Sequence, residues 1–237
     1  MTNDEVSNYV DLFVKNNKGL NDVNFLVYKS IDNALPRVPK EVRDELNFQG
    51  AYYPTDKTVV IIADQHKNTS ELQTTLNHEV YGHHGINHLT REEKKQLLEK
   101  IIEYPSDSTI GKFRDALLSK GYENLRDKPM MLAEETYAHL AELLPNSKEK
   151  FRGELNINEI KTGKDLMNVI RSVKGGIQSG ELEHKITPER NDLQFKKDIS
   201  LNKPEMAEKT HSNKTVLDFI NSMKQDKQKE QSRGIER

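Results

Sequence analysis

The chain has 237 residues, enough for one domain of ordinary size with extensions. Only 34% of the residues are hydrophobic while 31% are charged, so we expect part of the chain to be solvated and not packed in a core. Acidic and basic residues nearly balance, at a formal net charge of −2, and the absence of cysteine excludes disulfides and thiolate zinc sites.

The pattern of apolar and turn residues predicts an α+β fold. Two β-rich runs, at 50–53 and 58–63, flank Pro-Thr-Asp-Lys, a turn composition, and are therefore expected to form a hairpin. A small sheet packed on one helix, with several helices after it, is typical of the α+β class. In chain order we expect a helix at 4–14, a strand at 23–28, a short helix from Lys40, the hairpin, a helix from 68–70 that carries several histidines, and helices at 90–104, 110–118, 130–145 and 166–173.

The chain changes character after residue 176, where hydrophobic residues thin out and Lys, Glu, Asn, Gln and Ser dominate. We therefore expect one domain over residues 1–176 and a charged, extended or disordered tail over 177–237. Within this tail, an amphipathic stretch at 215–223 would form a short helix able to dock on a protein partner. From His184 onward the tail has 12 Lys and Arg against 9 Asp and Glu. These charges are interleaved, which is no strong nucleic-acid signature, because counterion release rewards clustered cations.

The sequence also bears on location. No segment approaches the roughly 18 consecutive apolar residues of a membrane helix. The first residues, Met-Thr-Asn-Asp-Glu-Val, lack the basic start and apolar core of a signal peptide. We expect a cytoplasmic protein, although transfer to another cell by a specialised system leaves no such mark.

Residues 78–85 read His-Glu-Val-Tyr-Gly-His-His-Gly and carry the densest chemistry of the chain. His-Glu followed one helical turn later by His is how zinc hydrolases place two metal ligands and a general base together. Here the position four residues after His78 is Gly82, and the next histidines are His83 and His84. The second ligand would therefore come one residue late.

This five-residue spacing suits one metal only if the helix is widened. Residues four apart differ by about 40° around a regular α-helix, whereas residues five apart differ by about 140°. An i→i+5 turn brings positions five apart onto one face, and we predict such a turn, or a break, at Gly82, so that His78 and His83 bind one metal. Glu79 would then be the general base, and His84 is a weaker ligand candidate. The alternative is that these histidines simply face solvent.

A catalytic zinc usually has three protein ligands and leaves a fourth position for water. The third ligand is expected from the helix at 130–145, where Glu135 begins Glu-x-x-Ala-His, which fits the Glu-x-x-Ala-(polar) pattern often seen in zinc hydrolases with a glutamate ligand. In that register His139 supports the ligands by hydrogen bonding. Glu134 is the second choice. The alternative for both glutamates is that they merely complement the helix dipole.

These motifs and their order resemble the zincin-like metallopeptidase domains in polyvalent proteins of phages, prophages and conjugative plasmids. The resemblance covers residues 20–145. It rests on Gln-Gly-Ala-Tyr-Tyr-Pro at 49–54, Val-Val-Ile-Ile-Ala-Asp at 59–64, the His-Glu-x-x-Gly-His-x-Gly run, and Ala-Glu-Glu-Thr-Tyr-Ala-His-Leu-Ala-Glu at 133–142. The family has Gly-Phe-Tyr where this chain has Ala-Tyr-Tyr at 51–53, which should matter little for the chemistry. The resemblance implies a zincin-like scaffold and a zinc hydrolase with a protein or peptide substrate of unknown identity.

The residues and the resemblance together predict a zinc metallopeptidase of a mobile genetic element. Zinc (Zn²⁺), held by His78, His83 and Glu135, would activate a water molecule and polarise the scissile carbonyl. Glu79 would take the proton of that water and pass it to the leaving amine. The candidates for stabilising the oxyanion, among which the sequence does not choose, are Tyr81, Tyr137 and His139.

Two other functions remain open. The first is a degenerate zincin that acts as a binding or accessory protein, and the intact His-Glu-His set argues against it. The second is a metal-dependent nuclease, suggested by the adjacent His83 and His84. Histidine-based nucleases usually frame their paired histidines in a hairpin followed by a helix, whereas here the pair falls late in a helix.

Overall fold

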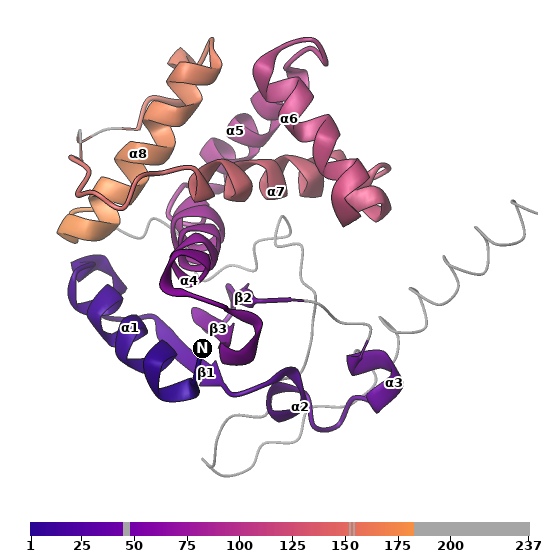
Figure 1. Cartoon of the computed structure of the whole chain (residues 1–237). Coiled ribbons are helices and arrows are strands. Elements are labelled where there is room, and N and C mark those ends of the chain that lie inside the picture. Colours follow the sequence, from indigo (N-terminus) through magenta and orange to yellow (C-terminus); the bar gives the residue numbers. More distant parts are fainter. Residues whose placement is uncertain (45–47, 152, 154, 183–237) are drawn as a thin grey trace, which may run out of the picture.

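The computed structural model describes residues 1–182 except 45–47, 152 and 154. Helices surround a small sheet, so the fold belongs to the α+β class expected from the sequence (Figure 1). Among the described residues, no helix is both long enough and apolar enough to cross a membrane.

The sheet has three strands in the order β1–β3–β2. The central strand β3 (Thr58–Ile62) is buried at every position and runs parallel to β1 (Asn24–Tyr28). At the other edge, β2 (Gly50–Tyr53) pairs with β3 in antiparallel orientation, which confirms the predicted hairpin. The edge strand β2 contacts the histidine-bearing helix, so the sheet borders the candidate site.

The helices begin where the sequence provides capping residues. The side chain of Asn68 accepts hydrogen bonds from two backbone N–H groups at the start of α4 (Thr69–Leu76). Thr90 and Glu93 form the predicted capping box at the start of α5 (Arg91–Glu103). The other α-helices are α1 (Asn3–Lys15), α2 (Ile31–Ala34), α3 (Lys40–Arg43), α6 (Thr109–Leu117), α7 (Pro129–Glu142) and α8 (Gly163–Ser179). Short turns of 3-10 helix are η1 (Lys18–Leu20), η2 (Ala63–Gln65), η5 (Glu123–Leu125) and η6 (Ile157–Glu159).

Helix α4 continues without a break into a π-helical segment, η3 (Asn77–His84). At its end, the backbone N–H of Gly85 donates to the carbonyl of Val80, five residues earlier. The i→i+5 turn predicted from the histidine spacing is therefore confirmed.

The π-helical segment packs against α7, which crosses it (Figure 1). The two helices approach closely at Gly82, where an added Cβ would lie 2.7 Å from both Cα and Cβ of Ala138. No real Cβ contact is that short, so the two helices can meet at this distance only because residue 82 has no side chain. The ligand candidates on η3 and α7 are thus brought together by the packing of the core itself.

The last described helix, α8, runs past the domain end expected at residue 176 and stops at Ser179. It is longer than the predicted helix at 166–173 and packs against both η3 and α7. Nearly all of the predicted tail at 177–237, and the whole of the helix predicted at 215–223, lie outside the described residues.

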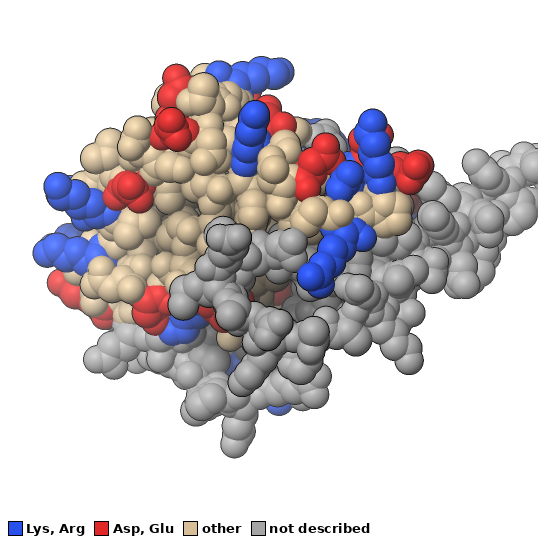
Figure 2. Space-filling view, turned by 90° about the horizontal axis from the view of Figure 1, so that it is seen from below, with Lys and Arg blue, Asp and Glu red and all other residues tan. Residues whose placement is uncertain are grey.

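The surface turned toward the viewer in Figure 2 carries Lys and Arg side chains scattered among Asp and Glu. The described side chains form no large patch of one sign on this face. Such an interspersed surface offers no clustered cations for a nucleic-acid backbone on that side.

We expect Gly82→Ala to lower the free energy of unfolding by about 1–3 kcal/mol, the usual cost of overpacking a closed contact. It should also weaken the expected binding of a metal ion by residues on η3 and α7, because the new methyl group pushes the two helices apart. Chemical denaturation and titration with a divalent metal ion measure the two effects.

A control for this substitution is Gly163→Ala at the start of α8, where the added Cβ would meet only side-chain atoms of Ile110 at 3.0 and 3.3 Å. This variant should keep both its stability and its metal affinity, because alanine favours a helix and the isoleucine side chain can move. Unchanged stability and metal affinity in Gly82→Ala would contradict the importance given to this close contact.

Candidate metal centre

Three predicted ligands converge where η3 meets α7. His78 and His83 from η3 and Glu135 from α7 each offer one ligand atom, and these atoms all lie within 4.8 Å of one another. The two imidazole Nε2 atoms are 3.2 Å apart. One oxygen of Glu135 lies 3.6 Å from Nε2 of His78, and the other lies 3.8 Å from Nε2 of His83.

These separations suit a tetrahedral zinc site. Ligand atoms about 2.0–2.1 Å from zinc at tetrahedral angles are roughly 3.3 Å apart. The distance between the two nitrogens matches this value, and each nitrogen has a different oxygen of Glu135 a few tenths of an ångström beyond it. All three side chains are partly exposed, so the cluster is reachable from solvent.

The protons of both imidazoles are turned away from the cluster. Nδ1 of His78 lies 2.7 Å from an oxygen of Glu142, and Nδ1 of His83 lies 3.4 Å from an oxygen of Glu134. A carboxylate only accepts hydrogen bonds, so each Nδ1 must carry the donated proton. When both imidazoles are neutral, each Nε2 atom therefore carries a lone pair and no proton. These lone pairs point toward each other and toward Glu135, so the centre of the cluster has no positive charge.

Without a metal, a second proton on the His83 imidazole supplies the positive charge at the centre of the cluster. Burial lowers the pKa of His83, but the hydrogen bond to Glu134 and the charges of Glu135 and Glu79 outweigh it and raise the pKa to about 9. A metal ion would take the place of this proton. The donor set, two imidazoles and a carboxylate, therefore fits a divalent cation.

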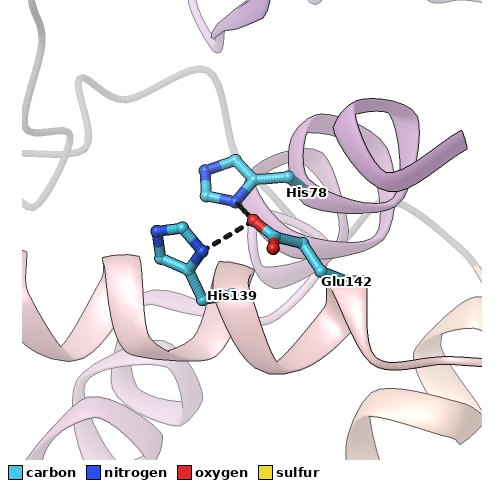
Figure 3. Close-up of side chains that lie close together, drawn as sticks. All are labelled: His78, His139 and Glu142. Atoms are coloured by element: carbon cyan, nitrogen blue, oxygen red, sulfur yellow. Dashed lines mark hydrogen bonds and ion pairs between the residues drawn. The ribbon is translucent and has the colours of Figure 1, made fainter. Parts of the chain in front are cut away.

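Glu142 holds two histidines at once (Figure 3). One oxygen accepts from Nδ1 of His78 at 2.7 Å and from Nδ1 of His139 at 2.6 Å. Burial raises the pKa of Glu142, but the hydrogen bonds from His139 and His78 outweigh this and lower the pKa to about 2. These three side chains could also hold a metal ion by distance. Their nitrogens already donate to the same oxygen, so we interpret them as the support of His78.

His139, predicted to support the ligands by hydrogen bonding, is hydrogen-bonded to the Glu142 carboxylate that also holds His78. Glu142 itself was missed by sequence reasoning. The available signal was its position on α7, because residues 135, 139 and 142 are spaced to share one helical face. Their shared face is the one turned toward η3.

Glu134, the second choice for the third ligand, lies behind His83. It pairs with the ammonium group of Lys94 at 3.0 Å, and that group also donates to the side chain of Asn87 at 3.0 Å. Burial raises the pKa of Glu134, but the Lys94 charge and the His83 hydrogen bond lower it to about 2. The Asn87 amide in turn donates to the carbonyl of His83 at 2.7 Å. Glu134 is therefore placed to orient His83, while Glu135 faces both Nε2 atoms.

Lys94 was also missed, although the sequence held a signal for it. Its side chain is 0% exposed, which is rare for lysine unless the charge is paired. Lys94 lies three, four and seven residues before Leu97, Leu98 and Ile101, which are all buried. Residues at these spacings share one face of a helix, so Lys94 lies on the apolar face of the expected helix at 90–104. A lysine on the apolar face of a helix indicates a buried acid nearby.

Glu79, the predicted general base, is buried next to the cluster at 6% exposure. Burial raises the pKa of its carboxyl group, the charges of His78 and His83 lower it, and that of Glu135 raises it again. The backbone N–H of Tyr52, on the edge strand β2, donates to this carboxylate and fixes its position. A buried carboxyl group with a raised pKa beside two imidazoles suits proton transfer near neutral pH.

The remaining candidates lie elsewhere. His84 is fully buried, and its Nδ1 is 3.0 Å from the hydroxyl of Tyr52. The hydroxyl of Tyr81 donates to the side chain of Asn17 inside the core at 2.7 Å. Tyr137 is 0% exposed, and its hydroxyl has no hydrogen-bond partner among the described residues. Neither tyrosine is placed to meet a substrate.

Another tyrosine, Tyr122, borders the cluster and was not among the candidates. It ends the turn η4 (Leu118–Tyr122), and its hydroxyl is 3.0 Å from Nε2 of His139 and hydrogen-bonds to Glu135. Burial, followed by the charges of Glu135, Glu79 and Glu142, raises the pKa of this phenol, so the hydroxyl keeps its proton. No sequence motif indicates this role, because Tyr122 lies 13 residues before Glu135 in a segment without a motif.

Comparison with known proteins adds no further constraint: no family model, curated protein or solved structure matches the chain.

Lys94→Met is expected to lower the free energy of unfolding by roughly 3 kcal/mol or more, because it leaves the buried Glu134 carboxylate without its counter-charge. Chemical denaturation of the metal-free protein measures this loss. The adjacent Lys95→Met is a matched control, because the Lys95 side chain is 58% exposed and forms an exposed pair with Glu99 at 3.7 Å. Its effect should stay within about 0.5 kcal/mol. Equal effects of the two substitutions would contradict the role given to Lys94.

Proposed function

We propose that this chain is a zinc-dependent hydrolase, a metallopeptidase of a mobile genetic element. The proposal rests on one observation: the Nε2 lone pairs of His78 and His83 and the carboxylate of Glu135 face one another. The buried Glu79 carboxyl group beside this set supports a hydrolytic role. A binding site alone would have no use for a base in that position.

Zinc bound by these three residues would lower the pKa of a water molecule toward about 7 and polarise a carbonyl group. The side chains have separate tasks. Glu142 and Glu134 hold the two imidazoles with their Nε2 atoms turned inward. Glu79 takes a proton from the attacking water and delivers it to the leaving amine, and the Tyr52 backbone N–H keeps its carboxylate aimed at the cluster.

The choice of zinc and of a peptide bond rests on chemistry and on the family resemblance. Two imidazoles and one carboxylate, with a fourth position left for water, are a common ligand set of catalytic zinc. The resemblance of residues 20–145 to zincin-like metallopeptidase domains of phages and plasmids favours a peptide substrate. The proposed protein or peptide substrate would react where the cluster is open to solvent.

The ligand set is tested by metal content. The purified full chain should bind about one zinc ion per molecule, and His78→Ala, His83→Ala and Glu135→Gln should each abolish binding at micromolar zinc, because each removes one of three ligands. Inductively coupled plasma mass spectrometry before and after treatment with a chelator measures the content.

Glu134→Gln is the matched comparison for Glu135→Gln, since it makes the same change at the neighbouring position. It should weaken zinc binding by roughly 10–100-fold without abolishing it, the usual effect of removing a group that orients a ligand. Greater loss in Glu134→Gln than in Glu135→Gln would transfer the ligand role to Glu134.

Catalysis is tested separately from binding. Glu79→Gln should keep the zinc and the fold but lose hydrolysis of a cleaved peptide by roughly 10²–10⁴-fold, because the amide cannot accept the proton. Screening the zinc-loaded parent and variant on a proteome-derived peptide library, with cleavage read by mass spectrometry, makes the comparison without a known substrate. Equal cleavage by the two proteins, or none by the parent, would favour a zincin that only binds a partner.

A further inference from the structure

One histidine of the motif at 78–85 has no part in the candidate ligand set. His84 directly follows the ligand candidate His83, yet its side chain is 0% exposed and lies against the ring of Tyr52, with ring centroids 5.2 Å apart. Nδ1 of His84 is 3.0 Å from the Tyr52 hydroxyl. Burial raises the pKa of this phenol, so the hydroxyl keeps its proton and can donate it to the nitrogen. The hydrogen bond ties the π-helical segment η3 to the edge strand β2.

The imidazole of His84 is also contacted by His88. The two rings meet edge-on with centroids 4.6 Å apart, and Nδ1 of His88 lies 3.1 Å from the carbonyl oxygen of His84. Both histidines are buried, at 0% and 4% exposure. Contacts with two rings restrict the His84 imidazole, so it offers the Tyr52 hydroxyl a fixed partner.

The pairing of β2 with β3 turns the backbone N–H of Tyr52 away from the sheet. The N–H of Ile62 donates to the carbonyl of Gln49 at 2.9 Å, which makes residues 49 and 62 a hydrogen-bonded pair. In an antiparallel ladder such pairs alternate with pairs that are not hydrogen-bonded. Tyr52 lies opposite Val59, three positions further on, so its N–H points away from β3. This N–H donates to the carboxylate of Glu79.

Strand β2 also lies close against the helix that carries Glu79. An added Cβ at Gly50 would be 2.7 Å from Cγ2 of Thr75 and 3.3 Å from Cγ of Glu79. Gly50 and Tyr52 are two residues apart and therefore share one face of the strand. Because β2 is an edge strand, the sheet holds it from one side, through β3. The bond between Tyr52 and His84 holds it from the side of η3.

We propose that His84 is a positioning residue for the general base: by holding the Tyr52 side chain, it keeps the backbone N–H of the same residue on the Glu79 carboxylate. The hydroxyl and the N–H belong to one residue, so a ring that is released lets the N–H move as well. The inference rests on the proposed function, in which Glu79 is the base. It gives the second histidine of the adjacent pair at 83 and 84 a task that involves no metal ion.

The test reads the hydrogen bond to Glu79 directly, by the NMR chemical shift of the residue-52 amide proton in the isotope-labelled full chain. An N–H that donates to a carboxylate resonates downfield, and Glu79→Gln sets the scale, because it removes the charge. Tyr52→Phe keeps the ring and should move this resonance upfield by a large part of that change. Loss of stability alone leaves the chemical shifts of the folded protein where they are. Tyr53→Phe is the matched control, because it removes a hydroxyl from the opposite face of the same strand and should leave the residue-52 amide unmoved.

Two substitutions of His84 make the same comparison from the other partner. His84→Leu should move the residue-52 amide as Tyr52→Phe does. His84→Asn should keep it near its position in the parent, because the asparagine amide places a polar atom near that of Nδ1. An unmoved amide in both Tyr52→Phe and His84→Leu would overturn the proposal.

Catalysis gives the second readout and separates this inference from the proposed function. On a peptide that the zinc-loaded parent cleaves, Tyr52→Phe should lower kcat by roughly tenfold and leave KM unchanged, because a displaced base slows the reaction without weakening substrate binding. A moved amide with kcat like that of the parent would overturn the positioning role. A moved amide with no peptide cleaved by the parent would refute the peptidase function and still show that His84 holds Tyr52 on Glu79.

Discussion

His78 and His83 are five residues apart, and one ion can be held by both only where the helix makes an i→i+5 turn. Such turns are rare because their geometry is less favourable than that of the α-helix, and they persist where surrounding packing stabilises them. Here the packing is supplied by α7, which meets η3 at Gly82 too closely for any side chain at that position. The same contact carries Glu135 to the two imidazoles. The metal centre and the core of the fold therefore depend on one helix crossing.

Charge is the second constraint on the centre. Four carboxyl groups, those of Glu79, Glu134, Glu135 and Glu142, lie in or beside the cluster. Lys94 compensates Glu134, and His139 can compensate Glu142. Of the remaining two, Glu135 faces the imidazole lone pairs and Glu79 is buried beside the imidazoles, and neither forms an ion pair with a lysine or arginine among the described residues. A divalent ion would supply the missing positive charge. It would also relieve the repulsion among the carboxylates and imidazole lone pairs, which a single added proton only partly offsets.

Much of this arrangement could be predicted from the sequence because it follows from local spacing. The i→i+5 turn, the hairpin and the caps of α4 and α5 each depend on residues close together in the chain. Glu142, Lys94 and Tyr122 were missed because their roles arise from contacts between elements distant in sequence. Position 94 lies 40 residues before its partner at 134, and sequence periodicity shows only that this lysine is buried, not what it meets. The parallel pairing of β1 with β3 was missed for the same reason.

The residues around the centre also differ in how firmly they are held. The candidate metal ligands and the groups that hydrogen-bond to them lie on η3, α5 and α7, which pack together through the main core. Tyr122 lies instead on the turn η4, which packs on a small separate cluster of Leu117, Leu125 and Leu132. A change in that turn can therefore move the hydroxyl while leaving the ligand geometry intact. The candidate ligands and Tyr122 therefore belong to different parts of the fold, and the His139–Glu142 pair links Tyr122 to His78.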